Sequence, residues 1–163
     1  MRPLTVDDTE ALLTYRGDAD VCRYLPFEPM DRDVLALRLA GDLGREQITA
    51  EGEGLTFGVE LAADGRLIGD VVLFFTSARH SGGEIGYVFH PDVAGKGYAT
   101  EACAAVLDLA FDTTSAGLGV HRVIALMDGR NLASGRLAAR LGMRQEAYHR
   151  SCEMFKCRRS WKF

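Results

Sequence analysis

The sequence predicts one α/β domain in which an antiparallel sheet is flanked by helices. Two observations carry this prediction: residues 55–76 form two strand-like runs about a short turn, and residues 98–111 repeat apolar side chains with helical spacing. The chain has 163 residues, 47% apolar and 26% charged, which suffices for one core. No repeat, low-complexity tract or linker divides it, so we treat residues 1–163 as a single domain.

The first part of the chain is expected to hold a short strand at residues 2–4 and two helices. Thr5 and Asp8 form an imperfect capping box before the apolar run ALLTYR, which indicates a helix start. The loop YLPFEPMD then leads to a second helix, expected from Asp31 to about Arg45. One side of that helix is expected to carry Val34, Leu37 and Leu43.

From residue 55 onward the pattern favours strands. LTFGVEL, the turn AADG and RLIGDVVLFFT are typical of a β-hairpin. EIGYVFH, residues 84–90, continues the antiparallel sheet, and the segment YATEACAAVLDLAF after it predicts a helix that packs on the sheet. Its apolar face comprises Ala99, Ala102, Cys103, Val106, Leu107, Ala110 and Phe111.

A glycine-containing turn joins this strand to this helix. Gly95 and Gly97 lie where the first helical turn begins, and residues without Cβ let unpaired backbone N–H groups approach an anion closely. Such a helix start suits a pyrophosphate, although an isolated G-x-G more simply makes a tight turn. An ATP or GTP loop is disfavoured because Gly97 follows Lys96, and a dinucleotide fingerprint because Thr100 occupies its third glycine position.

Composition and charge exclude several classes of partner. A formal charge of -4 and a pI near 5.6 provide no general basic field for nucleic acid. The longest apolar runs, 71–75 and 123–127, are far shorter than the roughly 20 residues of a membrane span. The start MRPLTVDD does not resemble a signal peptide. We therefore expect a soluble, cytoplasmic protein.

The cysteines and histidines predict no metal site. No C-x-x-C pair exists, so buried or idle thiols are the simpler interpretation than a zinc knuckle or a disulfide framework. The cysteines are Cys22, Cys103, Cys152 and Cys157. Ligand spacing is equally absent for His80, His121 and His149.

Two segments, GKGYATEA and NLASGRLAARLGM, resemble the acetyl-coenzyme A (acetyl-CoA) signature of the Gcn5-related N-acetyltransferases, the GNAT superfamily. MRPLTVDDTEALLTY, DADVCRYLPF and RLIGDVVLF extend the resemblance over most of the chain. They are most similar to the RimJ/RimL-like branch, which acetylates ribosomal-protein N termini. The resemblance implies the GNAT fold, a mixed and mostly antiparallel twisted sheet with one splayed parallel strand pair and flanking helices, with acetyl-CoA as co-substrate.

The resemblance also implies where the cofactor binds. The motif Q/R-x-x-G-x-G/A falls on residues 94–99, with Ala94 in place of the usual polar residue, so a side-chain phosphate contact is lost while the backbone cradle remains. EIGYVFH and the later parallel strand HRVIALMD are implied to splay, with pantetheine between them and a bulge near Tyr87 and Val88 that aims an amide at the thioester oxygen. The implied cofactor residues are Val88, Phe89, His90, Gly95, Lys96, Gly97, Tyr98, Ala99, Thr100 and Asn131.

Asn131 and Ser134 match a second motif of the family. By composition alone Asn131 is a good helix N-cap and Gly142 a good helix stop, so capping alone and capping with a pantetheine contact both stay open. Many relatives carry a tyrosine acid where this chain has Ala138. The resemblance therefore assigns proton donation to the Ser134 hydroxyl. The alternative is that Ser134 is only a polar residue in the first turn of the helix.

The amine must lose a proton to be acetylated, and the reference pKa is about 7.7 to 8.0 for an α-amine and about 10.4 for lysine. Glu84 is the candidate base, because related histone acetyltransferases carry a glutamate at a similar place, offset by one residue. Glu84 could instead be a solvated residue at the start of a strand, in which case a water chain would act as the base. His90 is a secondary candidate for the base. The acceptor pocket is assigned to Tyr24, Phe27 and Glu28, which equally suit loop packing.

The expected activity is direct transfer of an acetyl group from acetyl-CoA to a primary amine, either a protein N terminus or a small molecule, within a ternary complex. A catalytically inactive acyl-CoA-binding module is the alternative, followed by a nucleotide-binding phosphotransferase. EAYHRSCEMF predicts one more strand, and the short basic FKCRRSWKF after it predicts a last strand that is truncated, displaced or supplied by a partner. An exposed sheet edge favours a homodimer.

Overall fold

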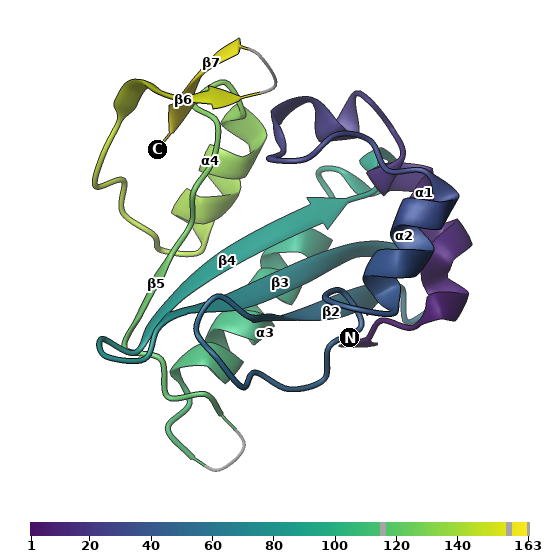
Figure 1. Cartoon of the computed structure of the whole chain (residues 1–163), viewed down its shortest axis with the longest axis horizontal. Helices are drawn as coiled ribbons and strands as arrows, with labels where there is room; N and C mark the ends of the chain where they lie inside the picture. Colours follow the sequence, from purple (N-terminus) through teal and green to yellow (C-terminus); the bar gives the residue numbers. More distant parts are fainter. Residues whose placement is uncertain (115–116, 156–157, 163) are drawn as a thin grey trace.

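The computed structural model describes residues 1–114, 117–155 and 158–162 (Figure 1). Its main layer is a five-stranded sheet of order β1-β2-β3-β4-β5, antiparallel from β1 to β4 and parallel between β4 and β5. This arrangement confirms the predicted mixed sheet. The strands are β1 (Arg2–Pro3), β2 (Gly54–Glu60), β3 (Leu67–Ser77), β4 (Gly82–Phe89) and β5 (Arg122–Ile124).

Helices cover both faces of this sheet (Figure 1). One buried cluster joins α1 and α2 to the sheet through Leu12, Leu35 and Val88. The other joins α3 and α4 to the opposite face through Val106, Leu137 and Ile85. The helices are α1 (Thr9–Arg16), α2 (Arg32–Leu39), α3 (Tyr98–Phe111) and α4 (Leu132–Arg140), with short 3-10 helices η1 (Val6–Asp8), η2 (Val21–Tyr24) and η3 (Pro91–Val93).

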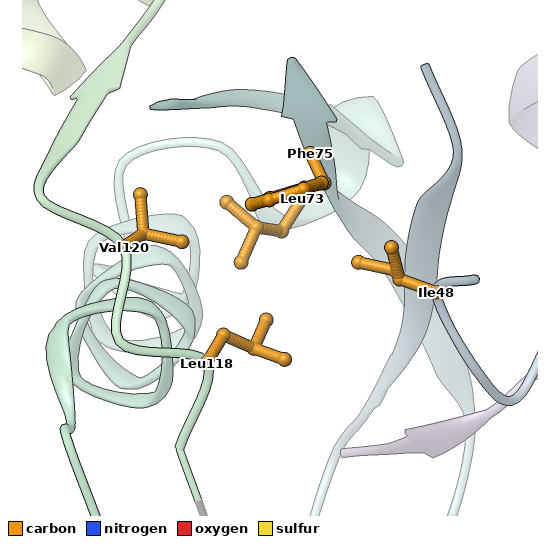
Figure 2. A pocket seen from close by; sticks show the side chains of 5 residues that line it. All are labelled: Ile48, Leu73, Phe75, Leu118 and Val120. Carbon is orange, nitrogen blue, oxygen red and sulfur yellow. The ribbon is translucent and has the colours of Figure 1, made fainter. Parts of the chain in front are cut away.

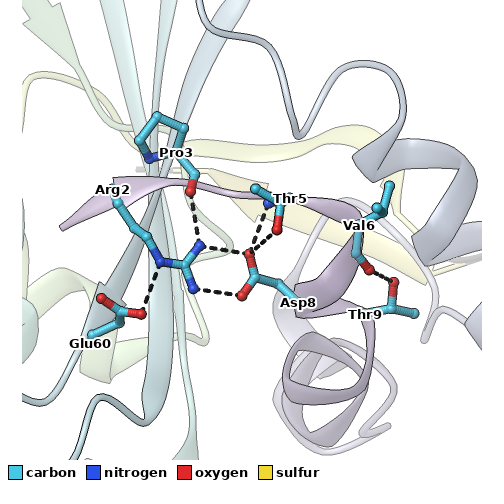
Figure 3. A network of polar contacts seen from close by, with 7 residues as sticks. All are labelled: Arg2, Pro3, Thr5, Val6, Asp8, Thr9 and Glu60. Carbon is cyan, nitrogen blue, oxygen red and sulfur yellow. Dashed lines mark hydrogen bonds and ion pairs between the residues drawn. The ribbon is translucent and has the colours of Figure 1, made fainter.

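The predicted capping box at Thr5 is present, and it belongs to a larger polar network at the N terminus (Figure 3). The amide of Thr5 donates to the Asp8 carboxylate over 2.8 Å. Arg2 donates to both oxygens of that carboxylate and to Glu60 of β2. The hydrogen bonds from Arg2 lower the pKa of Asp8. Strand β1 is thereby tied both to the first helix and to β2.

Helix α2 is shorter than predicted and presents a different face. It ends at Leu39 rather than near Arg45, and Gly44 then passes so close to the end of the helix that a Cβ there would lie 2.1 Å from the Leu39 carbonyl oxygen. The predicted face was wrong in two of three residues: Val34 and Leu37 are 42% and 75% exposed. The side that packs on α1 carries Leu35 and Leu39, and Leu43, which follows the helix, joins the same buried cluster.

Helix α3 is present where the sequence predicts it, and most of its predicted apolar face is buried. Its buried side chains are Ala102, Cys103, Val106 and Ala110, whereas Phe111 at the end of the stripe is 48% exposed. Burial raises the pKa of the Cys103 thiol to about 12, as expected of an idle cysteine. Cys22 is also buried. Cys157 lies outside the described residues.

Strands β4 and β5 separate soon after they meet. Their parallel pairing covers only residues 82–84 of β4 and 122–124 of β5, while β4 continues to Phe89 (Figure 1). The predicted bulge near Tyr87 and Val88 is not present: β3 and β4 pair one to one from Gly69 with Phe89 onward, and their register shifts only at the far end. The gap therefore arises from divergence of β5, not from a kink in β4.

The C-terminal strands stand apart from the main sheet. β6 (His149–Phe155) and β7 (Arg158–Lys162) pair antiparallel in a separate two-stranded sheet, the β6–β7 hairpin (Figure 1). The strand predicted at EAYHRSCEMF is thus confirmed as β6. Of the three predicted outcomes for the last strand, displacement is the one observed.

In the described part of the chain, no helix is long and apolar enough to cross a bilayer, and no three His, Cys, Asp or Glu residues lie together in a metal-binding arrangement. A small apolar cavity of about 200 Å³ lies where β3 ends and β4 begins (Figure 2). Its lining residues are Ile48, Leu73, Phe75, Leu118 and Val120. It holds no polar side chain and lies at the end of the sheet opposite the gap, so we assign it no chemistry.

Candidate functional site

The turn before α3 has the geometry of an anion cradle. Gly95 and Gly97 adopt positive φ angles of 77° and 89°, a conformation that residues with a Cβ rarely adopt. Both are exposed, and a Cβ at either position would meet no atom within 4 Å. Gly97 is the N-cap of a 14-residue helix, so the first amides of α3, including those of Tyr98 and Ala99, have no acceptor within the helix.

The predicted pantetheine positions at the end of β4 are not equivalent. The amide of His90 donates to the Ile68 carbonyl of β3 over 2.8 Å, so it is already used. Because amide directions alternate along a strand, the amide of Phe89 points to the other edge, toward the gap. The His90 ring accepts from the amide of Asp92 over 3.2 Å and caps η3. His90 thus ends the strand, as its position before Pro91 suggested.

The start of α4 and the strand β4 are joined across the gap. Asn131 caps α4 by accepting from the Ser134 amide over 3.1 Å, which confirms the predicted cap. The Tyr87 hydroxyl, from β4, donates to the Ser134 carbonyl over 3.1 Å. Burial raises the pKa of Tyr87 to about 12. At neutral pH this phenol therefore stays protonated, so it holds α4 in place and does not act as a base.

A cation lies beside the glycine turn. Arg140, the last residue of α4, approaches the Thr100 hydroxyl of α3, with 3.4 Å between Nε and Oγ1. Both side chains are at least partly exposed. Arg140 can therefore supply the positive charge that the motif lacks at Ala94. Arg140 and Thr100 are 40 residues apart, so local sequence patterns cannot predict this contact.

The predicted acceptor loop is held by a buried ion pair. Arg16 of α1 and Asp70 of β3 make two hydrogen bonds of 2.9 and 2.6 Å, and the Tyr15 hydroxyl donates to Asp70 over 2.9 Å. Asp70 has no exposed surface, and the Arg16 residue is 3% exposed. The guanidinium of Arg16 lies 5.1 Å from the ring centre of Phe27. Phe27 therefore packs the loop onto the buried ion pair, which is the alternative role that the sequence left open for it.

A second contact joins the acceptor loop to the start of α4. The Arg130 guanidinium lies 5.6 Å from the ring centre of Tyr24. Arg130 is held by the buried carboxylate of Asp128, whose pKa is lowered by these hydrogen bonds. Residues 24 and 130 thus bring together the loop after α1 and the loop that leads to Asn131.

Glu84 lies where the parallel pairing ends. It forms the last matched pair with Ile124 of β5 and is half-buried. Side chains alternate along a strand, so Glu84 shares the face of Val88, which packs with α1 and α2, while Tyr87 lies on the other face. The carboxylate is therefore on the side of the predicted acceptor loop. Glu28 of that loop is exposed.

Comparison with known proteins decides the family. The model of the acetyltransferase (GNAT) domain matches residues 1–144. The chain belongs to the GNAT acetyltransferase family. An uncharacterized N-acetyltransferase of Bacillus subtilis (strain 168), YnaD, is 30% identical over 155 residues, which cover 93% of this chain and 82% of that protein.

Solved structures agree with this assignment. A GNAT-family acetyltransferase from Bacillus anthracis superposes with a TM-score of 0.85 at 28% identity, over 99% of this chain and 89% of that one. A spermidine N-acetyltransferase from Vibrio cholerae, solved with CoA and spermine, has a TM-score of 0.81 at 21% identity, over the same shares of the two chains. This second likeness concerns the fold.

GNAT enzymes use acetyl-CoA, and the cradle of this chain fits its diphosphate. The open space beside Gly95 and Gly97 admits a bulky anion, and the first amides of α3 point out of the helix. The sequence signals found these residues, together with Asn131. They missed Tyr87 as a link to α4, Arg140 and Arg130, because each of these acts on a partner more than 30 residues away.

Proposed function

We propose that this GNAT chain transfers an acetyl group from acetyl-CoA to a primary amine by direct attack, without an acyl-enzyme intermediate. The observation that carries the proposal is the exposed glycine cradle directly after β4, the strand that diverges from β5. Acetyl-CoA, when bound, supplies an activated acyl thioester. The amides at the start of α3, with Lys96 nearby, hold the diphosphate, and the free edge of β4 at Phe89 accompanies the pantetheine arm.

In the proposed reaction the amine nitrogen bonds to the acetyl carbon, the carbon–sulfur bond breaks, and one proton leaves the nitrogen while one reaches the departing sulfur. Glu84 accepts the first proton, directly or through water, because it lies where the strands part. Ser134 donates toward the sulfur from the first turn of α4. Tyr87 fixes that turn by its hydrogen bond to the Ser134 carbonyl.

The acceptor is proposed to enter beside the loop that carries Tyr24, Phe27 and Glu28. Both aromatic rings face guanidinium groups, those of Arg130 and Arg16, which fix this loop beside α4 and the sheet. Protein N-terminal α-amines, as in the RimJ/RimL-like branch, and small-molecule amines are the two acceptor classes. Polyamines belong in the test because one solved structure of this fold is a spermidine N-acetyltransferase.

The experiment is release of free thiol from acetyl-CoA in the presence of peptides with free N termini, polyamines, amino acids and aminoglycosides. Release above the hydrolysis rate with at least one amine supports the proposal. Cofactor binding by calorimetry with no release across the panel supports instead an inactive acyl-CoA-binding module. Protection from heat unfolding by ATP but not by CoA contradicts both.

Replacing Glu84 with Gln tests the proposed base. We expect kcat/KM at pH 7 to fall by about 10² to 10⁴-fold, the usual contribution of a positioned base, with little change in Kd for acetyl-CoA. The measurement is the initial rate as a function of pH. The parent rate should rise with pH as the carboxylate ionises, and this rise should be absent from the profile of the variant. Glu46→Gln, at an exposed loop position, is the matched control. Activity within twofold of the parent would assign the proton to water.

Replacing Arg140 with Ala tests the cation beside the cradle. We expect Kd for acetyl-CoA to rise by about tenfold, or roughly 1.4 kcal/mol, because the guanidinium beside Thr100 is lost. Arg136→Ala, an exposed arginine one turn earlier on α4, is the control and should leave Kd unchanged. The measurement is calorimetry at two salt concentrations, where the difference between the variants should shrink at high salt. Equal Kd values for both variants would exclude a contribution of Arg140 to acetyl-CoA binding.

We also propose that the chain acts as a homodimer. β5 is the last strand of the main sheet in the described part of the chain, and unpaired strand edges favour association.

A further inference from the structure

Two loops from different parts of the chain meet at one contact between an aromatic ring and a guanidinium group. Tyr24 ends η2 in the loop after α1, and its half-buried ring has its centre 5.6 Å from the guanidinium carbon of Arg130. A cation at such a distance is attracted to the face of the ring. Arg130 directly precedes Asn131, the N-cap of α4. The contact therefore connects the proposed acceptor loop to a residue proposed to bind the pantetheine arm.

The Arg130 side of this contact is fixed by one buried carboxylate. The Arg130 guanidinium donates to both oxygens of Asp128, over 2.9 and 2.5 Å, and the Arg130 amide donates to one of them over 2.9 Å. The Asp128 side chain is 2% exposed, and the Asp128 carbonyl accepts from the Asn131 amide over 2.8 Å. Because Asp128 holds both Arg130 and Asn131, the orientation of the guanidinium follows the start of α4.

The Tyr24 side of the contact belongs to a loop that side chains hold in place. The sequence after Tyr24 is LPFEPMD, in which two prolines lack the amide needed to donate a backbone hydrogen bond. Phe27 packs this loop on α1 through Arg16, whose guanidinium carbon lies 5.1 Å from the centre of the Phe27 ring. Tyr24 packs it on Arg130. The second contact, unlike the first, reaches the segment that leads into α4.

We propose that Arg130 positions the acceptor loop through Tyr24, so that the start of α4 and the amine-binding loop move as one unit. The inference rests on the proposed function and adds a positioning residue to its acceptor site. A coenzyme that binds at Asn131 and restrains the start of α4 then also restrains residues 23–28. By linkage, a bound amine strengthens coenzyme binding by the same factor. A contact of this kind at an exposed site changes an equilibrium by about two- to fivefold.

Hydrogen exchange measured by mass spectrometry tests this link without any amine. Saturating CoA should slow exchange of the amides in residues 23–28 of the parent by about two- to fivefold. Tyr24→Leu keeps an apolar side chain but removes the ring, and it should lose this slowing while CoA still binds. Tyr24→Phe keeps the face of the ring and should retain the slowing. The control is Arg23→Met, which removes an exposed arginine of the same loop and should behave like the parent.

The arginine side is tested with D128N/R130M, because removal of Arg130 alone would leave the buried Asp128 carboxylate without its counter-ion. Asn keeps an oxygen for the amide of residue 130, and circular dichroism checks the fold. The slowing should be lost in this variant too. Slowing that persists would mean that CoA contacts the loop directly, and would overturn the role of Arg130. CoA binding by calorimetry with no slowing in the parent overturns it as well.

Steady-state kinetics with an active amine supply the second readout. We expect Tyr24→Leu and D128N/R130M each to raise KM for the amine by about two- to fivefold, with little change in kcat. Combining all three substitutions should raise KM no further, because both variants remove the same contact. Effects that multiply would show that Tyr24 and Arg130 act separately, which overturns the proposal.

The two readouts distinguish failure of this link from failure of the proposed function. If no amine releases free thiol while exchange behaves as expected, the proposed catalysis is wrong and the link between the two loops stands. If the parent does not bind CoA, the proposed coenzyme site and the link are both wrong. If amines are acetylated but CoA does not slow exchange in residues 23–28, the link alone is wrong.

Discussion

Replacing Gly97 with Val is expected to abolish tight binding of acetyl-CoA while the fold survives. Gly97 caps α3 at φ 89°, where a β-branched residue costs about 1–3 kcal/mol of backbone strain. The added side chain also points into the open space that the diphosphate needs. We expect Kd to rise by about 100-fold, or roughly 2.7 kcal/mol, as measured by calorimetry on protein whose folding is checked by circular dichroism.

The control for this variant is Gly65→Val. Gly65 lies in the turn between β2 and β3, has a φ of 73°, and is likewise open around its missing Cβ. Both variants should therefore lose similar stability in urea unfolding, but only the change at Gly97 should weaken acetyl-CoA binding. Equal cofactor affinity in the two variants would mean that the turn before α3 is structural, and the proposed cofactor site would be wrong.

Replacing Asp70 with Ala is expected to produce the largest loss of stability among single changes in this chain. Arg16 is left with a buried charge and no counter-ion, which typically costs about 3–5 kcal/mol. Domains of this size are stable by only about 5–15 kcal/mol. The midpoint of urea unfolding should therefore fall steeply, and the variant should be close to unfolding at 37 °C.

Two further variants separate the buried pair from ordinary surface charge. Asp42→Ala removes the partner of Arg38, an ion pair in which the Asp42 side chain is 55% exposed, and should cost no more than about 1 kcal/mol. The double variant R16M/D70L replaces the buried charges with apolar side chains and should recover much of the loss. A single-variant effect no larger than that of Asp42→Ala would show that water reaches Asp70 in solution.

The sequence predicts the parts of this fold that local chemistry determines. The hairpin of β2 and β3, the turn before α3 and the cap at Asn131 depend on residues a few positions apart, and all three are confirmed. The face of α2 was wrong because apolar residues lie on several sides of it, and only packing against α1 decides which side is buried. Local periodicity does not contain that information.

The candidate site divides in the same way. The glycines of the cradle are visible in the sequence because their conformation is a local requirement. The pair of Arg16 with Asp70 spans 54 residues, and the contact of Tyr24 with Arg130 spans more than 100. An arginine on a predicted helix is most often a solvated residue, so no single-sequence pattern distinguishes these arginines from the others. Their partners are a consequence of sheet order and of where β5 diverges.

Both ends of the loop between α1 and α2 are hydrogen-bonded to the same carbonyl oxygen. The Arg16 carbonyl oxygen accepts from the Met30 amide over 2.9 Å and from the Cys22 thiol over 3.3 Å. Residues 23–29 thus form a loop whose two flanking residues, Cys22 and Met30, both bond to the end of α1. Changes in the length or side chains of such a segment need not disturb the scaffold to which both ends are bonded. If this loop borders the acceptor, as proposed, substitutions within it can alter amine selectivity without altering the fold.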